Sequence, residues 1–474
     1  MPYIVGDRQQ GLLLPECMDD YVGEADPVRV YDAFVEQLDF AQLAIAIDPH
    51  RVGHPEFDPH AMLKLLIYGY SYGIRSSRKL ERATHHNLSF IWLMGGLKPD
   101  HKTIARFRRN NCDALRNVLR QCARLCIKLG LIEGNTLFLD GTKIKANASM
   151  KHTWTAERCG KALRDIDRRI EEILDECEAA DAGEEQQPSL VARHQELRDQ
   201  RQMKAKIKDI LEELHREDKK SVNTTDPEAI RFRSGAQIEV GYNQQLVTDD
   251  RHGLIVHGDV VRQSNDVGLF SQQVDAAQET LERPCQRACA DAGFASPEDL
   301  MKMLERGVDV IVPLAHHSDF RAQFKYESKR DQYRCPEGHV LKRLGRNNAH
   351  RCWMYRITDP MVCRACSRWG TCTTSMKGRL IERPYAEETR EKLDRRSREA
   401  DGPALLRRRK ERAEHPFGHI KHNLGVRAFL LRGLNGVRAE AALAATAFNL
   451  VRMLTLVGAA GLLGSLAPRI EPTC

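Results

Sequence analysis

The sequence predicts an α/β protein in which a sheet-forming core follows a helical N-terminal segment. Within residues 1–130, apolar residues recur at helical spacing, as over 28–43 and 62–72, which predicts mostly helix. From residue 136 onward, short apolar runs alternate with helix-favouring segments, a pattern typical of α/β folds. The chain has 474 residues, more than one hydrophobic core usually holds, so two or three domains are expected.

The elements predicted after residue 130 follow a defined order. Their expected bounds are strand 136–147, strand 236–248, strand 253–262, helix 267–282, a short strand ending at Asp291, a helix opened by Ser296-Pro297-Glu298, strand 308–313, and helices 384–398, 403–423 and 437–456. Up to the helix at 403–423, the core elements run strand, strand, strand, helix, strand, helix, strand, helix. This is the order of the ribonuclease-H-like fold, which the sequence therefore predicts for the core.

Two segments interrupt that order. Residues 155–220 are highly charged and helix-favouring, with a break near Gly183 and Pro188, and they predict an inserted antiparallel helical hairpin. Residues 221–234 are expected to form a polar loop. The predicted domains are a helical N-terminal domain (1–130), a core (131–154 and 221–315), the hairpin (155–220), a cysteine-rich insertion (316–383) and C-terminal helices (384–474).

Positive charge is unevenly distributed along the chain. The formal net charge is only +7, yet arginine and lysine concentrate in 102–128, 201–220 and 377–432. Such clustering is typical of proteins that bind nucleic acids, although solvated helix faces give the same pattern.

The N-terminus and the apolar segments show no sign of export or membrane insertion. The first residues lack a long apolar stretch, and the most apolar window, 448–467, is interrupted by Arg452. We therefore expect a cytoplasmic protein without a membrane partner. Fourteen cysteines in such a protein predict reduced thiols and a metal site rather than a disulfide framework.

Three acidic residues end or follow predicted core elements. Asp140 closes the apolar run 137–139, Asp291 follows a short strand, and Glu414 lies in a basic C-terminal helix. In the ribonuclease-H-like order, these are the positions where metal ligands assemble. Three carboxylates can hold two Mg²⁺ ions for phosphoryl transfer on a nucleic acid. Each acid taken singly also has a structural explanation, as a cap, a turn residue or a surface ion-pair partner.

Basic residues near these acids are candidates for phosphate contact. Arg407 and Lys421 each lie seven residues from Glu414, close to two helical turns, so the three side chains are expected on one helix face. Lys143, just after Asp140, is a further candidate. Solvated helix charge is the alternative explanation for each of them.

A second basic surface is predicted in the N-terminal domain. Asp100 can cap a helix whose outer faces carry Lys102, Arg106 and Arg109. This helix suits the recognition helix of a helix-turn-helix DNA-binding domain. A small helical bundle with a charged rim is an equally good explanation.

A cysteine cluster in the second insertion predicts a zinc site. Cys363 and Cys366 form a CxxC pair with further thiols on both sides, in a basic, turn-rich stretch, and this pattern suits tetrahedral Zn²⁺. The predicted ligands are Cys335, Cys363, Cys366 and Cys372. His339 or Cys352 could replace one of them, and ordinary reduced thiols are the alternative. Four protein ligands would make this zinc structural, because no position would remain for water.

Several stretches of the chain together resemble one protein family. They are Phe57–Tyr70 with Pro99–Arg108, Leu139–Ala148, Asp226–Gln245 with Ala290–Phe294, and Glu414–Lys421. In this order they resemble the bacterial insertion-sequence transposases of the DDE type that carry an N-terminal helical transposase domain. The resemblance makes Asp140, Asp291 and Glu414 the metal-binding triad, with two Mg²⁺ ions for which Mn²⁺ can substitute.

The resemblance also carries expectations about function. It implies cleavage at the ends of a mobile element and joining of the freed 3′-hydroxyls to target DNA on the bacterial nucleoid. Because such a mechanism cuts two ends in concert, a homodimer in a synaptic complex is expected. A tyrosine–arginine–glutamate–lysine pattern of related enzymes is half kept. Glu414 and Lys421 fit it, whereas Arg407 stands at the tyrosine position and Lys410 at the arginine position. A nuclease without joining activity and a non-catalytic DNA-binding protein are the competing hypotheses.

Overall fold

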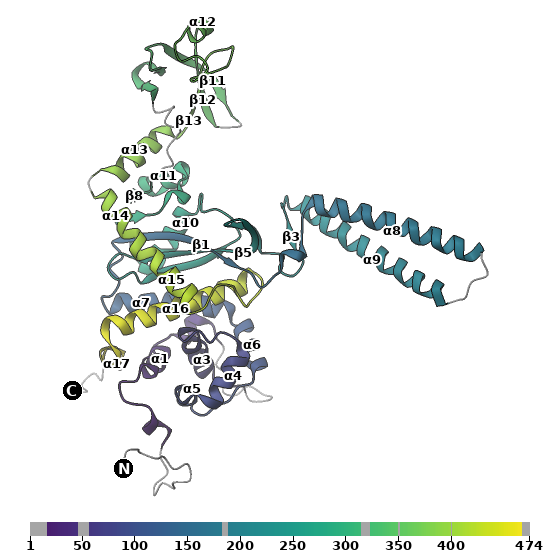
Figure 1. Ribbon diagram of the computed structural model, residues 1–474. Helices are drawn as coiled ribbons and strands as arrows, with labels where there is room; N and C mark the ends of the chain where they lie inside the picture. The colour runs from purple at the N-terminus through teal and green to yellow at the C-terminus, as the bar shows by residue number, and fades with distance from the viewer. Residues whose placement is uncertain are drawn as a thin grey trace, which may run out of the picture.

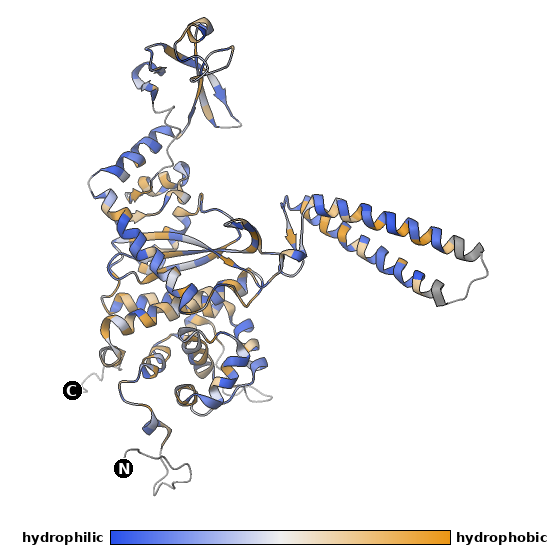
Figure 2. Cartoon of the chain, viewed as in Figure 1, coloured by the Kyte–Doolittle hydropathy of each residue, from blue (hydrophilic) through white to orange (hydrophobic). Residues whose placement is uncertain are grey.

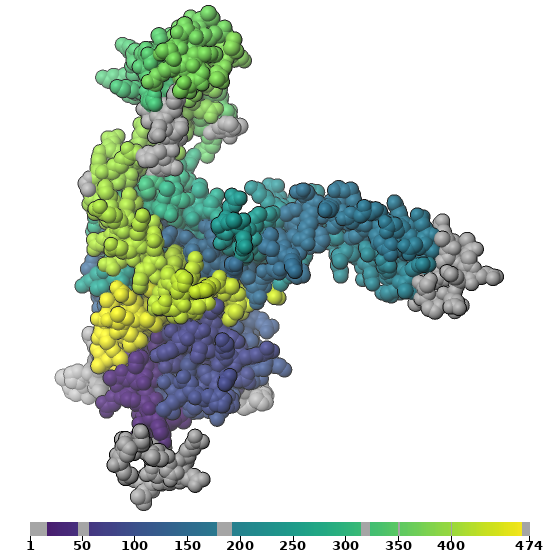
Figure 3. Space-filling view, in the orientation of Figure 1, coloured from purple at the N-terminus to yellow at the C-terminus, as the bar shows by residue number. Residues whose placement is uncertain are grey.

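The structure is a computed structural model that describes residues 17–45, 56–182, 188–313, 323–348, 351–399 and 401–466. A central sheet is flanked by helices, a two-helix arm projects from one end of the sheet, and a small sheet stands beyond the other end (Figure 1). In the space-filling view, the arm and the small sheet extend from one main body (Figure 3). The break expected near Gly183 lies outside the described residues.

The described N-terminal part is helical, as predicted. Its helices are α1 (Pro27–Glu36), α2 (Phe40–Leu43), α3 (Pro59–Ser71), α4 (Ser77–His86), α5 (Leu88–Leu93), α6 (His101–Asn110) and α7 (Cys112–Lys128). The apolar pattern over 28–43 is divided between two helices, because Asp39 caps α2 by accepting a hydrogen bond from the Gln42 backbone. Asp100 caps α6 as expected, accepting from the Thr103 N–H at 2.7 Å.

A six-stranded mixed sheet forms the centre of the molecule. Its strands are β1 (Thr136–Lys145), β4 (Ile230–Ser234), β5 (Gln237–Asp249), β6 (Ile255–Val261), β7 (Arg287–Cys289) and β8 (Asp309–Ile311). Strand β5 pairs with β4 and β6, and it also pairs antiparallel with β1. Strand β1 runs parallel to β7, which runs parallel to β8. The strands expected from the apolar runs are therefore all present, together with β4.

Strand β4 lies where the sequence predicted only a polar loop, so that prediction was wrong. The segment 221–234 contains β4 and also β3 (Val222–Asn223), which pairs with β2 (Thr153–Trp154). Strand β4 forms because the start of β5 offers it a backbone partner and because Phe232 is buried. Both features depend on tertiary context, which overrides local polarity.

Helices cover both faces of the central sheet. Helices α10 (Phe270–Leu281) and α11 (Pro297–Glu305) lie on one side, and α7 lies with α16 (Leu434–Val457) on the other (Figure 1). A second apolar cluster joins Phe138, Cys289 and Ile311 of the sheet to Leu405 and Ala413 of the C-terminal helices. This cluster fixes the helix that carries Glu414 over β1 and β7.

Helix α16 joins the N-terminal helices to the sheet. It packs against α3, α7 and β6, and the Asn449 side chain forms hydrogen bonds with the N–H and C=O of Ile255. One hydrophobic core contains residues of all these elements, so the boundary expected at residue 130 does not separate two cores. By length and composition α16 could cross a membrane, but 67% of its most apolar window is buried inside the protein.

A buried ion pair fastens the same junction. Arg75 Nη1 lies 2.8 Å from Glu440 Oε1, and Glu440 is fully buried. Glu440 also accepts hydrogen bonds from the backbone N–H groups of Leu430 and Leu431. Burial raises the pKa of Glu440, and these hydrogen bonds and Arg75 oppose that shift.

The arm consists of α8 (Ala156–Ala182) and α9 (Pro188–Arg216), which occupy the segment where a helical hairpin was predicted. Ile166 of α8 and Ile207 and Leu214 of α9 are buried in one apolar cluster between the two helices. Hydrophilic and hydrophobic residues alternate along both arm helices (Figure 2). Arg169 Nε of α8 lies 2.9 Å from Glu196 Oε1 of α9. Ion pairs between the two helices therefore add to their apolar contacts.

The cysteine-rich insertion forms its own antiparallel sheet. Its strands run in the order β13 (Leu380–Pro384), β12 (Cys352–Ile357), β11 (Val340–Asn347), β10 (Gln332–Arg334) and β9 (Lys325–Glu327), with α12 (Pro360–Arg364) beside them. A separate small core includes Tyr333, Leu341 and Tyr355. This sheet therefore packs largely on itself.

The C-terminal helices differ from the prediction at one point. After α13 (Glu387–Arg398), the expected single helix at 403–423 consists of α14 (Gly402–Arg409), a π-helical turn η6 (Lys410–Glu414) and α15 (His415–His422). A short helix α17 (Ala459–Leu466) follows α16. The π-helical turn changes which residues share a face.

Candidate active site

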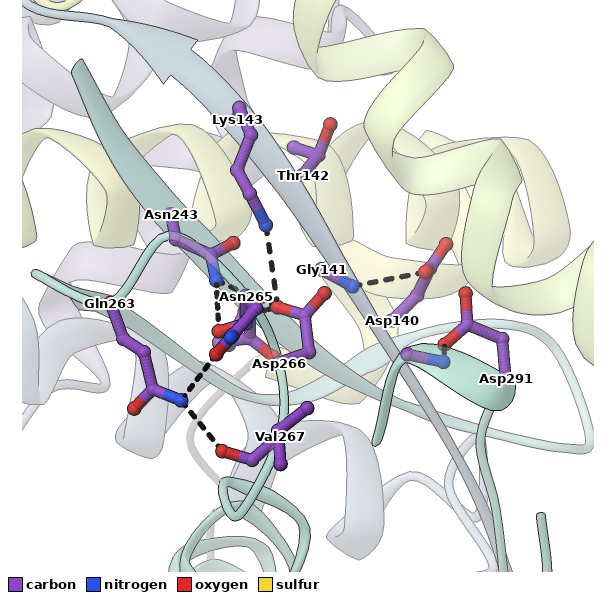
Figure 4. A network of polar contacts seen from close by, with 12 residues as sticks. Asp140, Gly141, Thr142, Lys143, Asn243, Gln263, Asn265, Asp266, Val267 and Asp291 are labelled. Atoms are coloured by element: carbon purple, nitrogen blue, oxygen red, sulfur yellow. Dashed lines mark hydrogen bonds and ion pairs between the residues drawn. The ribbon is translucent and has the colours of Figure 1, made fainter. Parts of the chain in front are cut away.

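Two of the three predicted acids are brought together by parallel strand pairing. Phe138 of β1 is opposite Cys289 of β7, so Asp140 and Asp291, two residues further along each strand, lie at the same edge of the sheet. Figure 4 shows both carboxylates there. Asp140 Oδ1 accepts a hydrogen bond from the Gly141 N–H, and Asp291 Oδ1 accepts one from the Gly293 N–H, both at 2.9 Å.

Glu414 reaches these aspartates from the π-helical turn. Arg409, just before the turn, is buried and lies between the acids: its Nη1 is 3.5 Å from Asp140 Oδ1 and its Nη2 is 3.7 Å from Glu414 Oε1. Arg409 and Glu414 are five residues apart, the i to i+5 spacing that a π-helix brings together. Sequence reasoning had assigned a cation near Glu414 to Lys410 and did not select Arg409.

The three carboxyl groups affect one another electrostatically. Burial raises the pKa of Asp140 to about 6, Arg409 opposes this shift, and the charges of Asp291 and Glu414 add to it. Asp140 is thus a partly buried acid with two like charges and one cation near it. Glu414 is the most accessible of these groups, with 58% of its side chain exposed.

Lys421 lies beside the acids, but Arg407 and Lys410 do not. Lys421 Nζ donates a hydrogen bond to Thr142 Oγ1 on β1. Burial lowers the pKa of Lys421, and nearby Asp140 opposes that shift. Arg407 and Lys410 are exposed, and among the described residues neither has a recorded ion pair. The extra residue in the π-helical turn means that seven residues before Glu414 no longer correspond to two α-helical turns.

A fourth acid, Asp266, was missed by sequence reasoning. Its Oδ1 accepts hydrogen bonds from Asn243 Nδ2 and Gln245 Nε2, both at 2.7 Å, and lies 3.5 Å from Lys143 Nζ (Figure 4). Lys143 is therefore held by an acid rather than free in solution. Two buried amides on one strand were the available signal, since buried polar side chains need partners.

Gly141 lies in close contact with this network, and a side chain at its position would displace it. A Cβ at Gly141 would lie 2.5 Å from Gln245 Nε2 and 2.6 Å from Asp266 Oδ1. At Gly293, a Cβ would lie 2.9 Å from Asp291 Oδ1 and 3.5 Å from Asp266 Oδ2. Close packing at both glycines places Asp266 beside the Asp140–Asp291 pair.

The basic residues of α6 lie on the surface of the N-terminal part. Lys102, Arg106 and Arg109 are all exposed, and their spacing puts them on neighbouring parts of one helix face. Ile104 and Arg108 of the same helix are buried, and Arg108 donates to the Arg75 carbonyl. The helix thus presents its cations outward, as a DNA-contacting helix must.

The predicted zinc ligands surround a common space in the small sheet. A cavity of about 30 Å³ is lined by Cys335, His339, Cys363, Cys366 and Cys372, among others. Burial raises the pKa of the Cys372 thiol, Arg379 opposes the shift, and the other three thiols add to it. Cys352 is buried in β12 and does not line this cavity.

The acid cluster offers carboxylate oxygens, which suit Mg²⁺, and the cysteine cluster offers thiolates, which suit Zn²⁺. Both donor sets therefore match the predicted metals. Within the part of the chain that the structure describes, however, no three acidic, thiol or imidazole groups are arranged to hold a metal ion as they stand.

Comparison with known proteins gives two sequence matches. Residues 16–110 match the family described as Transposase domain (DUF772), and residues 334–454 match the family described as Transposase DDE domain. The second match includes Glu414 and the cysteine cluster, whereas Asp140 and Asp291 lie in the unmatched segment between the two matches. No curated protein matches the chain.

One solved structure is similar over most of the chain. It is a cryo-EM structure of a piggyBac transposase synaptic complex with hairpin DNA, with 8% sequence identity, a TM-score of 0.36, and coverage of 94% of this chain and 77% of that chain. The two sequence matches cover the helical N-terminal part and the C-terminal region in chain order, and together they support an insertion-sequence transposase of the DDE class.

Proposed function

We propose that this transposase cleaves DNA at the ends of its mobile element and joins the freed 3′-hydroxyls to target DNA, using a ribonuclease-H-like core. The observation that carries the proposal is the convergence of Asp140, Asp291 and Glu414 with Lys421 at one edge of the sheet. A buried carboxyl group with a raised pKa and other acids beside it is a common feature of catalytic sites.

The acids are proposed to hold two Mg²⁺ ions, with Mn²⁺ as a substitute. Such ions, when bound, activate the attacking oxygen and stabilise the leaving oxygen of a phosphodiester. Asp140 must be ionised to act as a ligand, and Arg409 favours that form because its positive charge lowers the pKa of Asp140. Arg409 thus acts as a positioning residue for the acids.

Neighbouring cations are proposed to position the DNA strand. Lys421, hydrogen-bonded to Thr142, is proposed to contact the phosphate at the cleavage point. Asp266 orients Lys143 toward the same edge of the sheet. Arg407 and Lys410 would contact the backbone further out on the exposed helix surface.

The N-terminal helices are proposed to recognise the element end. Lys102, Arg106 and Arg109 of α6 would face DNA, with the preceding helices packed behind. Cutting and joining two ends in concert requires two active sites, so we propose a homodimer on DNA in the bacterial cytoplasm.

The small sheet is proposed to hold one structural Zn²⁺ through Cys335, Cys363, Cys366 and Cys372. The shared cavity supports this assignment, as does the effect of the other three thiols on the pKa of Cys372. His339 also lines the cavity and is the alternative ligand. Metal analysis of purified protein should find about one zinc per chain.

The test is a strand-transfer assay with purified protein, a labelled element-end duplex, a target plasmid and Mg²⁺. Joined product that disappears in Glu414→Gln but persists in Glu411→Gln would establish the reaction and its site, because Glu411 is an exposed acid of the same π-helical turn. Cleavage without joining would indicate a nuclease, and binding alone would indicate a non-catalytic DNA-binding protein.

A further inference from the structure

A cleft at the base of the arm is lined by five basic residues. The cleft has a volume of about 650 Å³ and lies where the chain leaves α9 and enters β4. Its cations, which we call the basic groove, are Lys219, Lys220, Arg231, Arg233 and Arg262. No acidic residue is among those that line it in the described part of the chain.

Most of these cations are not neutralised within the protein. Lys219 Nζ lies 2.9 Å from Glu213 Oε1 and is also paired with Glu217. The other four have no recorded ion pair among the described residues, and Arg231 Nε is buried without a hydrogen-bond partner. A buried donor without a partner is costly, so the groove is suited to an external anion.

The strand register relates the groove to the acids. Arg231 is opposite Val240 of β5, and Asp140 is opposite Leu246 of the same strand. Leu246 follows Val240 by six positions, and side chains an even number of positions apart on a strand point to the same face. Arg231 and Asp140 therefore lie on the same face of the sheet. At roughly 3.3 Å per residue, the two positions are about 20 Å apart along β5.

This separation matches a length of duplex DNA. With a rise of roughly 3.4 Å per base pair, about 20 Å corresponds to about six base pairs. Arg231 and Arg233 are two residues apart on one strand, so they can meet successive phosphates of a backbone that runs over the sheet. An isolated small anion would neutralise only a small part of the positive charge of the groove.

We propose that the basic groove binds the phosphate backbone of the duplex about six base pairs from the bond that the acids cleave. The inference rests on the proposed function, since it assumes that Asp140 marks the cleavage point. It assigns DNA contact to Arg231, Arg233 and Arg262, at the root of the arm.

The first test measures DNA affinity against salt concentration, without divalent ions so that no cleavage occurs. The triple variant Arg231→Gln/Arg233→Gln/Arg262→Gln should lower the slope of log affinity against log salt by about 2.7, or roughly 0.9 per lost phosphate contact. The matched control Lys329→Gln/Arg330→Gln/Arg346→Gln removes three exposed cations of the small sheet and should leave the slope nearly unchanged. Equal slopes for both variants would overturn the proposal.

The second test locates the contact on the DNA. Neutral methylphosphonates placed about six base pairs from the cleavage point should weaken binding by the wild-type protein and have no further effect on the triple variant. An equal loss for both proteins would overturn the assignment. Because both readouts are binding without catalysis, their failure would leave the transposase proposal standing. A fully active Glu414→Gln variant would instead count against the acid site and leave DNA binding by the basic groove standing. Circular dichroism melting would confirm that the variants are folded.

Discussion

The acid site and the cysteine cluster are two candidate metal sites of one chain, built in opposite ways. The acids come from β1, the segment after β7 and the π-helical turn, and they meet only because the main core packs these elements together. The cysteines all lie within one short segment, in α12 and the turns beside the small sheet, which has a core of its own. The difference teaches that one site takes its geometry from the whole molecule and the other from a local segment. Substitutions that disrupt one site should therefore leave the other site intact.

The largest effect is expected for Asp140→Asn. Asparagine keeps the shape of the side chain but removes the charge, so single-turnover cleavage should fall by about 10²-fold to 10³-fold or more. Zinc content and DNA affinity should stay unchanged, because the small sheet does not depend on Asp140. Undiminished cleavage by this variant would remove Asp140 from the site.

The next largest effect is expected for Arg75→Met, which leaves Glu440 as an uncompensated buried charge. The free energy of unfolding of the main core should fall by about 3–5 kcal/mol, measured by urea denaturation. The loss should be smaller at low pH, since burial already raises the pKa of Glu440 and protonation relieves the charge. The double variant with Glu440→Gln should recover part of the loss. DNA cleavage should fall at temperatures at which the main core unfolds, while the small sheet should still bind zinc.

Cys363→Ser/Cys366→Ser should produce the reverse pattern. Loss of two thiolate ligands should reduce bound zinc from about one per chain to none and expose the small sheet to proteolysis. The unfolding midpoint of the main core should change little. Cys352→Ser is the matched control, because Cys352 does not line the ligand cavity. A core that unfolds together with the small sheet would contradict their independence.

The smallest effect is expected for Arg409→Gln and should depend on pH. The pKa of Asp140 is about 6, above its ordinary value, and a metal ligand must be ionised, so cleavage should decline as pH falls through about 6. Arg409 favours the ionised form, so its removal raises this pKa and shifts the decline to higher pH. A shift of about one unit would lower the rate at pH 6 by about fivefold, with recovery near pH 8. An unshifted pH–rate profile would rule out this role.

Much of the central sheet could be predicted because its strands carry apolar runs bounded by turn residues. The same reasoning indicated Asp140 and Asp291, which follow such runs. It could not indicate β4, whose pairing partner and burial are supplied by β5. Nor could it find Asp266, whose partners Asn243 and Gln245 lie on a strand about twenty residues earlier.

The π-helical turn shows why helix periodicity misplaced the cations around Glu414. An α-helical repeat predicted that Arg407 would share a face with Glu414, but one wider turn brings Arg409 to the acids instead. A single π-helical turn changes the spacing of apolar residues too little to be recognised in the sequence. The cysteine cluster was easier to predict, because ligands close in sequence depend less on distant packing.

Helix α16 gives the N-terminal helices and the central sheet a common core. This shared core limits how mobile elements with such a transposase can diversify. A recombination point between residues 128 and 136 would pair α3 and α7 with a foreign α16, leaving mismatched apolar surfaces in the hybrid protein. The N-terminal helical part is therefore not an interchangeable module. If α6 contacts the element end as proposed, a lineage that acquires new terminal repeats is expected to do so by successive substitutions on the outer face of α6.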